Sequence, residues 1–248
     1  TLINNDFSKP VSADTDETEV ALLFEQRNLI SAPVIDENNQ LVGRITIDDV
    51  VDVIRDQAEH SVMSMVGLDE DEDVFAPIIQ SSKRRSVWLG VNLVTAFIAV
   101  YFIGLFEATL QQKIALAILM PVVASMGGIA GTQTLIIVTR GIATGRVTSA
   151  NIKTLINKEV AVSGLNGIIW SIVIGLITYY WFADLLLSLI IALAIITNLV
   201  VAAFSGAFLP LLLSKLKIDP ALAGGVILTT ITDVIGFVAF LGLAALFI

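Results

Sequence analysis

One apolar segment decides the fold class: residues 220–248 read PALAGGVILTTITDVIGFVAFLGLAALFI. The segment is long enough to span a bilayer, and its single charged residue, Asp233, lies near the middle. An ionised side chain at that depth costs about 2.5–3.5 kcal/mol even on lenient insertion scales, so it needs a partner or access to water. Asp233 and the hydroxyl-rich run 229–232 therefore predict the wall of a pathway for a cation. The alternative is an inward-facing carboxyl group that only helps helices to pack.

Composition divides the chain into two parts. Of its 248 residues, 56% are hydrophobic, which is typical of an integral membrane protein. Residues 1–82 carry 18 acidic and 4 basic side chains, whereas residues 83–248 carry 10 basic and 5 acidic ones. We therefore expect an acidic soluble domain followed by an apolar domain with basic loops.

Cysteine and histidine usage limits the chemistry. The chain has no cysteine and one histidine, His60, which excludes disulfides and thiolate ligation and disfavours a multi-histidine metal site within one chain. The first residues contain neither an initiator Met nor a signal-peptide pattern, so we expect the sequence to be a piece of a longer protein.

Residues 1–60 are predicted to form a small α/β unit. Its capping and turn residues separate short apolar runs of helical and strand character. The predicted elements are a capping segment at 15–18, a helix at 20–24, a strand at 32–35, a polar turn at 36–40, a returning strand at 41–47 and a second helix from Asp48 onward.

Residues 61–86 form a connector that contains five consecutive carboxylates, at 69–73, and ends in the basic run 83–85. The acidic run is either a solvated segment or a sensor of divalent cations, because clustered carboxylates repel one another until a hard cation bridges them. The residues alone leave both interpretations open.

The remaining domain, 87–248, is predicted to contain five membrane spans. They cover approximately 87–106, 114–138, 160–182, 185–213 and 220–247. All basic loop residues except Lys113 fall on one side, so the positive-inside rule places the acidic domain in the cytosol and the C-terminus outside. Five spans enclose a pore poorly, which favours a dimer with the pathway at its interface and Asp233 present twice. Three amides are predicted to be buried and to bridge helices: Asn92, Asn166 and Asn198.

Three glycines, Gly127, Gly128 and Gly131, interrupt the second span. Gly127 and Gly131 lie one turn apart, which lets another backbone approach closely. Pro121 frees a carbonyl upstream, and free carbonyls at this depth are tolerated where they line a wet cavity or are buried in protein. Packing and carbonyl ligation explain the glycines about equally well, and the nearby amide of Gln133 slightly favours a polar path.

Taken together, these motifs resemble the MgtE family of magnesium channels, in family order and over nearly the whole chain. In the membrane domain the resemblance rests on Pro121 with the glycine run, the loop 219–222 and the Thr-Thr-x-x-Asp pattern of 229–233. The N-terminal unit resembles the second half of a tandem CBS domain, at 32–36, 41–46 and 48–50.

The resemblance implies a mostly α-helical homodimer. A five-helix transmembrane domain at 87–248 would dimerise around a pore, with a small cytosolic α/β CBS unit at 1–60 and a connecting plug helix within 61–86. In the pore, Asp233 from two subunits would hold a largely hydrated Mg²⁺. The other implied pore positions are Thr229, Gly225, Gly127, Gly128 and Gly131.

The function implied by the resemblance is import of Mg²⁺ down its electrochemical gradient across the cell (inner) membrane. Mg²⁺ sheds water reluctantly, so recognition of the hydrated ion would disfavour Ca²⁺ but admit Mn²⁺ or Co²⁺ as competing ions. Cytosolic Mg²⁺ would inhibit by bridging acidic side chains and closing the plug. We expect those side chains to include Asp49, Asp52, Glu59, Asp69 and Asp71. A nucleotide is a further candidate ligand of the CBS unit, and no nucleic-acid partner is expected.

Two other classes of function compete with a channel. A proton-coupled divalent-cation transporter would alternate Asp233 between protonated and ion-bound states. A membrane sensor that transports nothing would report metal or nucleotide to a partner. An enzyme is not expected, because the spans contain no nucleophile–base pair and no paired carboxylates.

Overall fold

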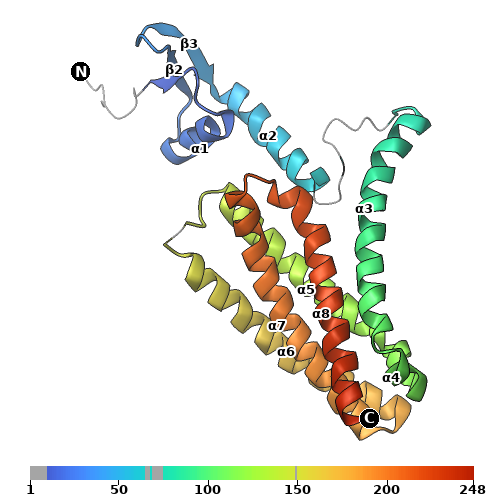
Figure 1. Cartoon of the computed structure of the whole chain (residues 1–248). Helices are drawn as coiled ribbons and strands as arrows, with labels where there is room; N and C mark the ends of the chain where they lie inside the picture. Colours follow the sequence, from blue (N-terminus) through green and yellow to red (C-terminus); the bar gives the residue numbers. More distant parts are fainter. Residues whose placement is uncertain (1–9, 65–67, 69–74, 149) are drawn as a thin grey trace. The chain divides into compact units, whose positions relative to one another are not determined.

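The computed structural model describes residues 10–64, 68, 75–148 and 150–248. These residues divide into two compact units, one of residues 10–64 and 68 and the other of residues 75–148 and 150–248. The first unit is α/β and the second is helical, as the elements drawn in Figure 1 show. This agrees with the predicted fold class.

The first unit contains a three-stranded sheet and two helices. Its sheet has the order β1-β2-β3, with β1 parallel and β3 antiparallel to β2. Phe24, which is 1% exposed, lies at the centre of its apolar core. The elements are β1 (Val11–Ser12), α1 (Glu17–Arg27), β2 (Ser31–Ile35), β3 (Leu41–Thr46) and α2 (Ile47–Ser64).

Capping residues fix where the two helices of this unit begin. The Asp16 carboxylate accepts a hydrogen bond from the Thr18 backbone N–H (2.9 Å) at the start of α1. At the start of α2, the Asp49 carboxylate accepts from both the backbone N–H (2.9 Å) and the hydroxyl (3.0 Å) of Thr46. Side chains that reach back in this way satisfy donors that the first helical turn leaves unpaired.

The second unit consists of α3 (Ile78–Gly104), α4 (Glu107–Gln112), α5 (Ile114–Ala143), α6 (Ile152–Phe182), α7 (Leu185–Lys215) and α8 (Pro220–Phe247). Among the described residues, five helices are long and apolar enough to cross a membrane: α3, α5, α6, α7 and α8. They correspond one to one with the predicted spans. The short helix α4 was not predicted, because six residues carry too little apolar periodicity to detect.

Several helices extend beyond the predicted boundaries. α3 begins at Ile78 rather than near 87, α6 begins at Ile152 rather than near 160, and α2 continues past residue 60 to Ser64. The added turns of α3 and α6 contain charged residues, which hydropathy excludes although they are helical. At a rise of about 1.5 Å per residue, α3 and α6 also exceed a hydrocarbon core of about 30 Å.

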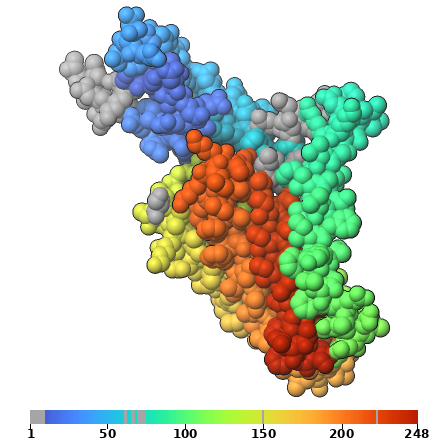
Figure 2. Space-filling view, viewed as in Figure 1, coloured from blue at the N-terminus to red at the C-terminus, as the bar shows by residue number. Residues whose placement is uncertain are grey.

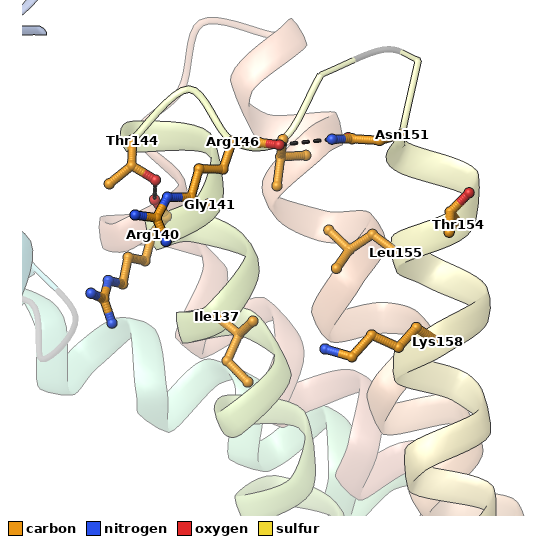
Figure 3. Close-up of a pocket in the computed structure, with 10 residues that line it drawn as sticks. Ile137, Arg140, Gly141, Thr144, Arg146, Asn151, Thr154, Leu155 and Lys158 are labelled. Atoms are coloured by element: carbon orange, nitrogen blue, oxygen red, sulfur yellow. Dashed lines mark hydrogen bonds between the residues drawn. The ribbon is translucent and has the colours of Figure 1, made fainter. Parts of the chain in front are cut away.

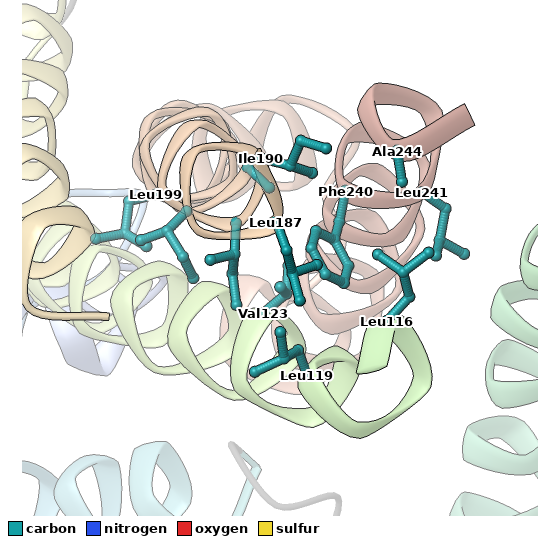
Figure 4. Packing of buried hydrophobic residues seen from close by; sticks show 12 residues of the cluster. Leu116, Leu119, Val123, Leu187, Ile190, Leu199, Phe240, Leu241 and Ala244 are labelled. Carbon is teal, nitrogen blue, oxygen red and sulfur yellow. The ribbon is translucent and has the colours of Figure 1, made fainter. Parts of the chain in front are cut away.

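The core of the second unit lies where α7 meets α5 and α8. Figure 4 shows Leu187 and Ile190 of α7 facing Val123 of α5 and Phe240 of α8. Leu187 and Phe240 are completely buried. α7 also packs along α6, which makes it the central helix of the unit.

α3 lies at the edge of this unit and packs mainly against α8. Ala99 is its one buried residue among those described, and Trp88, Thr95 and Phe102 are partly covered. Figure 2 shows side chains of α8 at the surface between α7 and α3, so one chain does not cover α8 on this face.

Candidate functional site

The predicted pathway residues lie on one face of α8. Gly225, Thr229 and Asp233 are spaced by four residues, which places them above one another on a helix. The Thr229 hydroxyl donates to the Gly225 carbonyl oxygen (2.8 Å). A hydroxyl that donates in this way keeps lone pairs that can accept, so Thr229 can still bind the water shell of a cation.

The carboxylate of Asp233 has no hydrogen bond or ion pair with any described residue of its own chain. Its side chain is partly exposed, whereas the neighbouring Thr232 and Gly236 are buried. Within the part of the chain that the structure describes, no three acidic or histidine residues come together as a metal cluster. Among the described residues, one chain therefore presents a single carboxylate at this level.

The three glycines of α5 have different surroundings. A Cβ at Gly127 would lie 2.2 Å from Nδ2 of Asn198, and a Cβ at Gly131 would lie 3.1 Å from the Leu228 methyl groups. A Cβ at Gly128 would meet no atom within 4 Å. Gly127 and Gly131 thus admit neighbouring helices, as the packing interpretation expects, whereas Gly128 faces open space.

The carbonyl group of Gly131 faces α7. Its oxygen lies 2.6 Å from the position that a Cβ on Gly206 would occupy, so the absence of a side chain at Gly206 makes this approach possible. This contact was not predicted. The signal was present in the small residues Ala202, Ala203 and Gly206, which recur at helical spacing in α7.

Asn198 of α7 contacts α5 and α8, and its neighbour in α8 is Gly236, three residues after Asp233. Asn198 is completely buried, and its amide nitrogen donates to the Val123 carbonyl oxygen of α5 (2.9 Å). A Cβ at Gly236 of α8 would lie 2.6 Å from the same nitrogen. The Asn198 Oδ1 atom has no hydrogen-bond partner among the residues that the structure describes. The predicted bridging role is therefore confirmed for Asn198.

The same prediction is wrong for Asn92 and Asn166 within one chain. Both side chains are exposed, and Asn92 donates to the Trp88 carbonyl oxygen of its own helix (3.2 Å). The sequence gives each amide an apolar context, but it does not reveal which helix face is covered.

One buried carboxylate was missed. Glu159 of α6 is 5% exposed, and the Lys158 ammonium lies 3.2 Å from its Oε1 atom. The available signal was an acidic residue next to a lysine at the edge of the third apolar span.

The predicted regulatory residues do not form a metal cluster among the described residues. Asp49 belongs to the cap of α2, Asp52 is exposed, and Glu59 accepts from the Arg55 guanidinium (3.2 Å). Asp69 and Asp71 lie outside the described residues.

The starts of α5 and α7 are tied together on the side of the predicted membrane domain that is opposite the basic loops. The Asp184 carboxylate caps α7 by accepting from the Leu187 backbone N–H (2.9 Å) and forms an ion pair with Lys113. The Leu187 hydrogen bond, followed by Lys113, holds the pKa of Asp184 below its usual value. Only Lys113 among the basic loop residues lies at this end, and the structure gives it a partner.

Two sequence families match the chain. The MgtE family, described as a divalent cation transporter, matches residues 120–243, which are half of the chain. The CBS domain family matches residues 8–56. The MgtE match includes the α5 glycines, Asn198 and Asp233, so all the predicted pore positions lie inside it.

Curated relatives match almost the whole chain. The magnesium transporter MgtE of Bacillus subtilis is 34% identical over 98% of this chain and 54% of its own length. Those of Enterococcus faecalis and Thermus thermophilus are 29% and 30% identical, over 96% and 95% of this chain and 52% and 53% of their own lengths. The chain thus spans about half the length of these relatives, which are named as transporters and not as enzymes. The family match and the five apolar helices together establish that this chain is a multi-pass membrane protein of the MgtE family.

Proposed function

We propose that this chain forms the membrane pathway of a magnesium transporter and works as a homodimer. The observation that carries the proposal is Asp233, a carboxylate inside a membrane helix with no partner among the described residues of its own chain. The names of the relatives supply the ion, because each is called a magnesium transporter.

A second copy would complete the site. Mg²⁺ takes octahedral oxygen coordination and usually keeps several of its waters. Two Asp233 carboxylates across a twofold axis would neutralise the dication and accept hydrogen bonds from its water shell. Thr229, Gly225 and the open position at Gly128 would contribute hydroxyl and carbonyl oxygens along the path. Gly127 and Gly131 stay in this proposal through their carbonyl groups, although the Gly131 carbonyl oxygen faces α7.

The chemistry of the site favours a gradient-driven channel. Recognition through retained water needs no covalent or redox step, and ions of similar hydration such as Mn²⁺ and Co²⁺ would compete. The orientation would follow the positive-inside rule, with the N-terminal unit in the cytosol and the C-terminus outside. The chain would lie in the cell (inner) membrane, in contact with lipid.

Regulation would involve the acidic N-terminal unit and connector. At high cytosolic Mg²⁺, ions would bridge carboxylates such as Asp52 and Glu59 with Asp69 and Asp71 and hold a plug closed. At low Mg²⁺, repulsion between these groups would favour the open state. The matched CBS domain makes a nucleotide a further candidate ligand. The change Asp69→Asn with Asp71→Asn should weaken inhibition by Mg²⁺ on the cytosolic side, and unchanged inhibition of flux would contradict this part.

The central test measures Mg²⁺ uptake into liposomes that contain the purified 248-residue chain and a trapped magnesium dye. Asp233→Asn removes the charge at nearly constant volume, so uptake should fall to the rate of empty liposomes. The matched control is Glu107→Gln, an exposed carboxylate on α4, which should leave uptake unchanged. Size-exclusion chromatography should give the same dimer for all three proteins.

Three outcomes would contradict the proposal. Normal uptake by Asp233→Asn would remove the residue from the pathway. Uptake that requires a pH gradient would favour a proton-coupled transporter. Absence of uptake by the unaltered chain would favour a sensor that transports nothing.

A further inference from the structure

A cavity opens where the end of α5 meets the start of α6. It has a volume of about 560 Å³, within the range of small-molecule sites. Ten residues line it, among them Ile137, Arg140, Arg146, Leu155 and Lys158 (Figure 3). Three are basic and none is acidic.

Local hydrogen bonds build the wall of this cavity. Gly145 has φ +64°, which allows the chain to turn sharply after α5. The Val147 backbone N–H then donates to the Gly141 carbonyl oxygen (2.9 Å), and a Cβ at Gly141 would lie 2.5 Å from the Val147 side chain. The Asn151 amide donates to the Arg146 carbonyl oxygen (2.7 Å) and closes the loop. The cavity is thus formed by a defined turn between the two helices.

The basic side chains lie at different depths. Figure 3 shows Lys158 pointing from α6 into the space between the helices, level with Ile137 of α5. Arg146 extends from the loop toward the end of α5, and Arg140 lies at the outer side of that helix. Lys158 is partly neutralised by Glu159 (3.2 Å). The two arginine side chains are exposed and pair with no carboxylate in the described chain.

The same cavity has an apolar part. Ile137 and Leu155 line it one turn or more into the helices, and the outward faces of α5 and α6 beyond them stay apolar, with Ile136 and Val162 exposed. A ligand that fits both parts needs an anionic group at the end of the helices and hydrocarbon alongside them. Arginine side chains bind phosphate through paired hydrogen bonds, and basic pockets between membrane helices suit lipid head groups.

We propose that this cavity binds the phosphate head group of an anionic phospholipid, with its acyl chains lying along α5 and α6. The lipid belongs to the leaflet that meets the ends of α5 and α7, which is the basic side of the membrane domain. The site is separate from Asp233, and its occupancy does not depend on ion transport.

The test titrates the purified chain in neutral detergent with phosphatidylglycerol or phosphatidylcholine of identical acyl chains and counts bound lipid by native mass spectrometry. The unaltered chain should retain phosphatidylglycerol preferentially. Each arginine that is removed takes away charge-assisted hydrogen bonds to the phosphate, so the preference should fall about tenfold per arginine and roughly 100-fold in Arg140→Gln with Arg146→Gln.

The matched control is Lys215→Gln with Lys217→Gln. These residues are exposed at the end of α7 on the same side of the domain and do not line the cavity, and the change removes the same charge. The control should keep the preference. Equal losses in both double variants would overturn the proposal, because general surface charge would then explain the binding.

Two further results would also overturn it. Equal retention of the two lipids by the unaltered chain would mean that no head group is selected, and this measurement needs no variant to fold. Inorganic phosphate that displaces phosphatidylglycerol as effectively as a short-chain phosphatidylglycerol does would assign the cavity to a soluble phosphate compound.

Discussion

The helices α7 and α3 are both strongly apolar, but only α7 is covered by its own chain. Half of the most apolar window of α7 is buried, against 6% of the corresponding window of α3. α7 packs against α5, α6 and α8, whereas α3 exposes large side chains such as Leu93 and Val94. Mean hydropathy measures transfer out of water and not contact with protein, so its values of 2.8 for α7 and 2.0 for α3 identify both as spans without showing which one is covered. The bare faces of α3 need acyl chains or a second copy to cover them.

Glycine to alanine changes should separate the two helices most strongly. In Gly206→Ala of α7, the new Cβ would lie 2.6 Å from the Gly131 carbonyl oxygen and 3.1 Å from Cβ of Thr134. Backbone atoms cannot move aside as the end of a flexible side chain can. We expect the free energy of unfolding to fall by about 1–3 kcal/mol, measured by denaturant titration of the purified chain in detergent.

The matched change in α3 is Gly90→Ala. A Cβ there would meet no atom of the chain within 4 Å. Alanine favours helix over glycine, so the free energy of unfolding should stay the same or rise by up to about 1 kcal/mol. Similar losses at Gly206 and Gly90 would contradict the contrast between the helices. A loss at Gly90 that depends on protein concentration would indicate that a second copy packs against α3.

The sequence allowed all five spans and both helices of the first unit to be predicted, because each carries a long apolar run or a capping signal. The Asp16 cap and the strands around 32–35 and 41–47 follow from residues a few positions apart. The first residues of α3 and α6 could not be predicted, since their N-terminal turns contain Lys83 and Lys153, among other charged residues. β1, which has two residues, gives no periodic signal at all.

Asn198 of α7 and Asn92 of α3 differ in the same way as the two helices, and the expected effect on stability is smaller. Asn198 of α7 is buried and donates to the Val123 carbonyl oxygen, whereas Asn92 of α3 is exposed. Asn198→Ala should lower the free energy of unfolding by about 1–2 kcal/mol, since hydrogen bonds between membrane helices contribute about 0.6 kcal/mol on average and the change also leaves a cavity. Asn92→Ala should change it by less than about 0.5 kcal/mol. A larger effect at Asn92 in the same denaturant titration would reverse the assignment of buried and exposed faces.

For the candidate site, the sequence predicted which residues share one face of a helix, but it did not predict the contacts between helices. The spacing of Gly225, Thr229 and Asp233 places them on one face from sequence alone. The roles of Gly127 and Gly128 depend on where Asn198 of α7 lies, and this is a contact between residues distant in the chain. Sequence therefore placed the predicted carboxylate, Asp233, in a membrane helix, while the packing around it required the structure.

The difference between the first residues of α7 and of α3 gives the smallest expected effect on the free energy of unfolding. α7 begins at Asp184, whose carboxylate accepts from the Leu187 N–H, whereas α3 begins at Pro77 without a side-chain cap. The pKa of Asp184 is lowered in the folded chain. Its carboxylate therefore stabilises the fold at pH values above the usual aspartate pKa of about 3.9, and this stabilisation is lost as the pH falls through the lower pKa of the folded chain. Asp184→Ala should therefore cost about 1 kcal/mol at pH 7, and the difference from the unaltered chain should shrink in titrations below about pH 4. A difference that stays constant to low pH would contradict this, because the neutral Asp184 side chain and not its charge would then stabilise the start of α7.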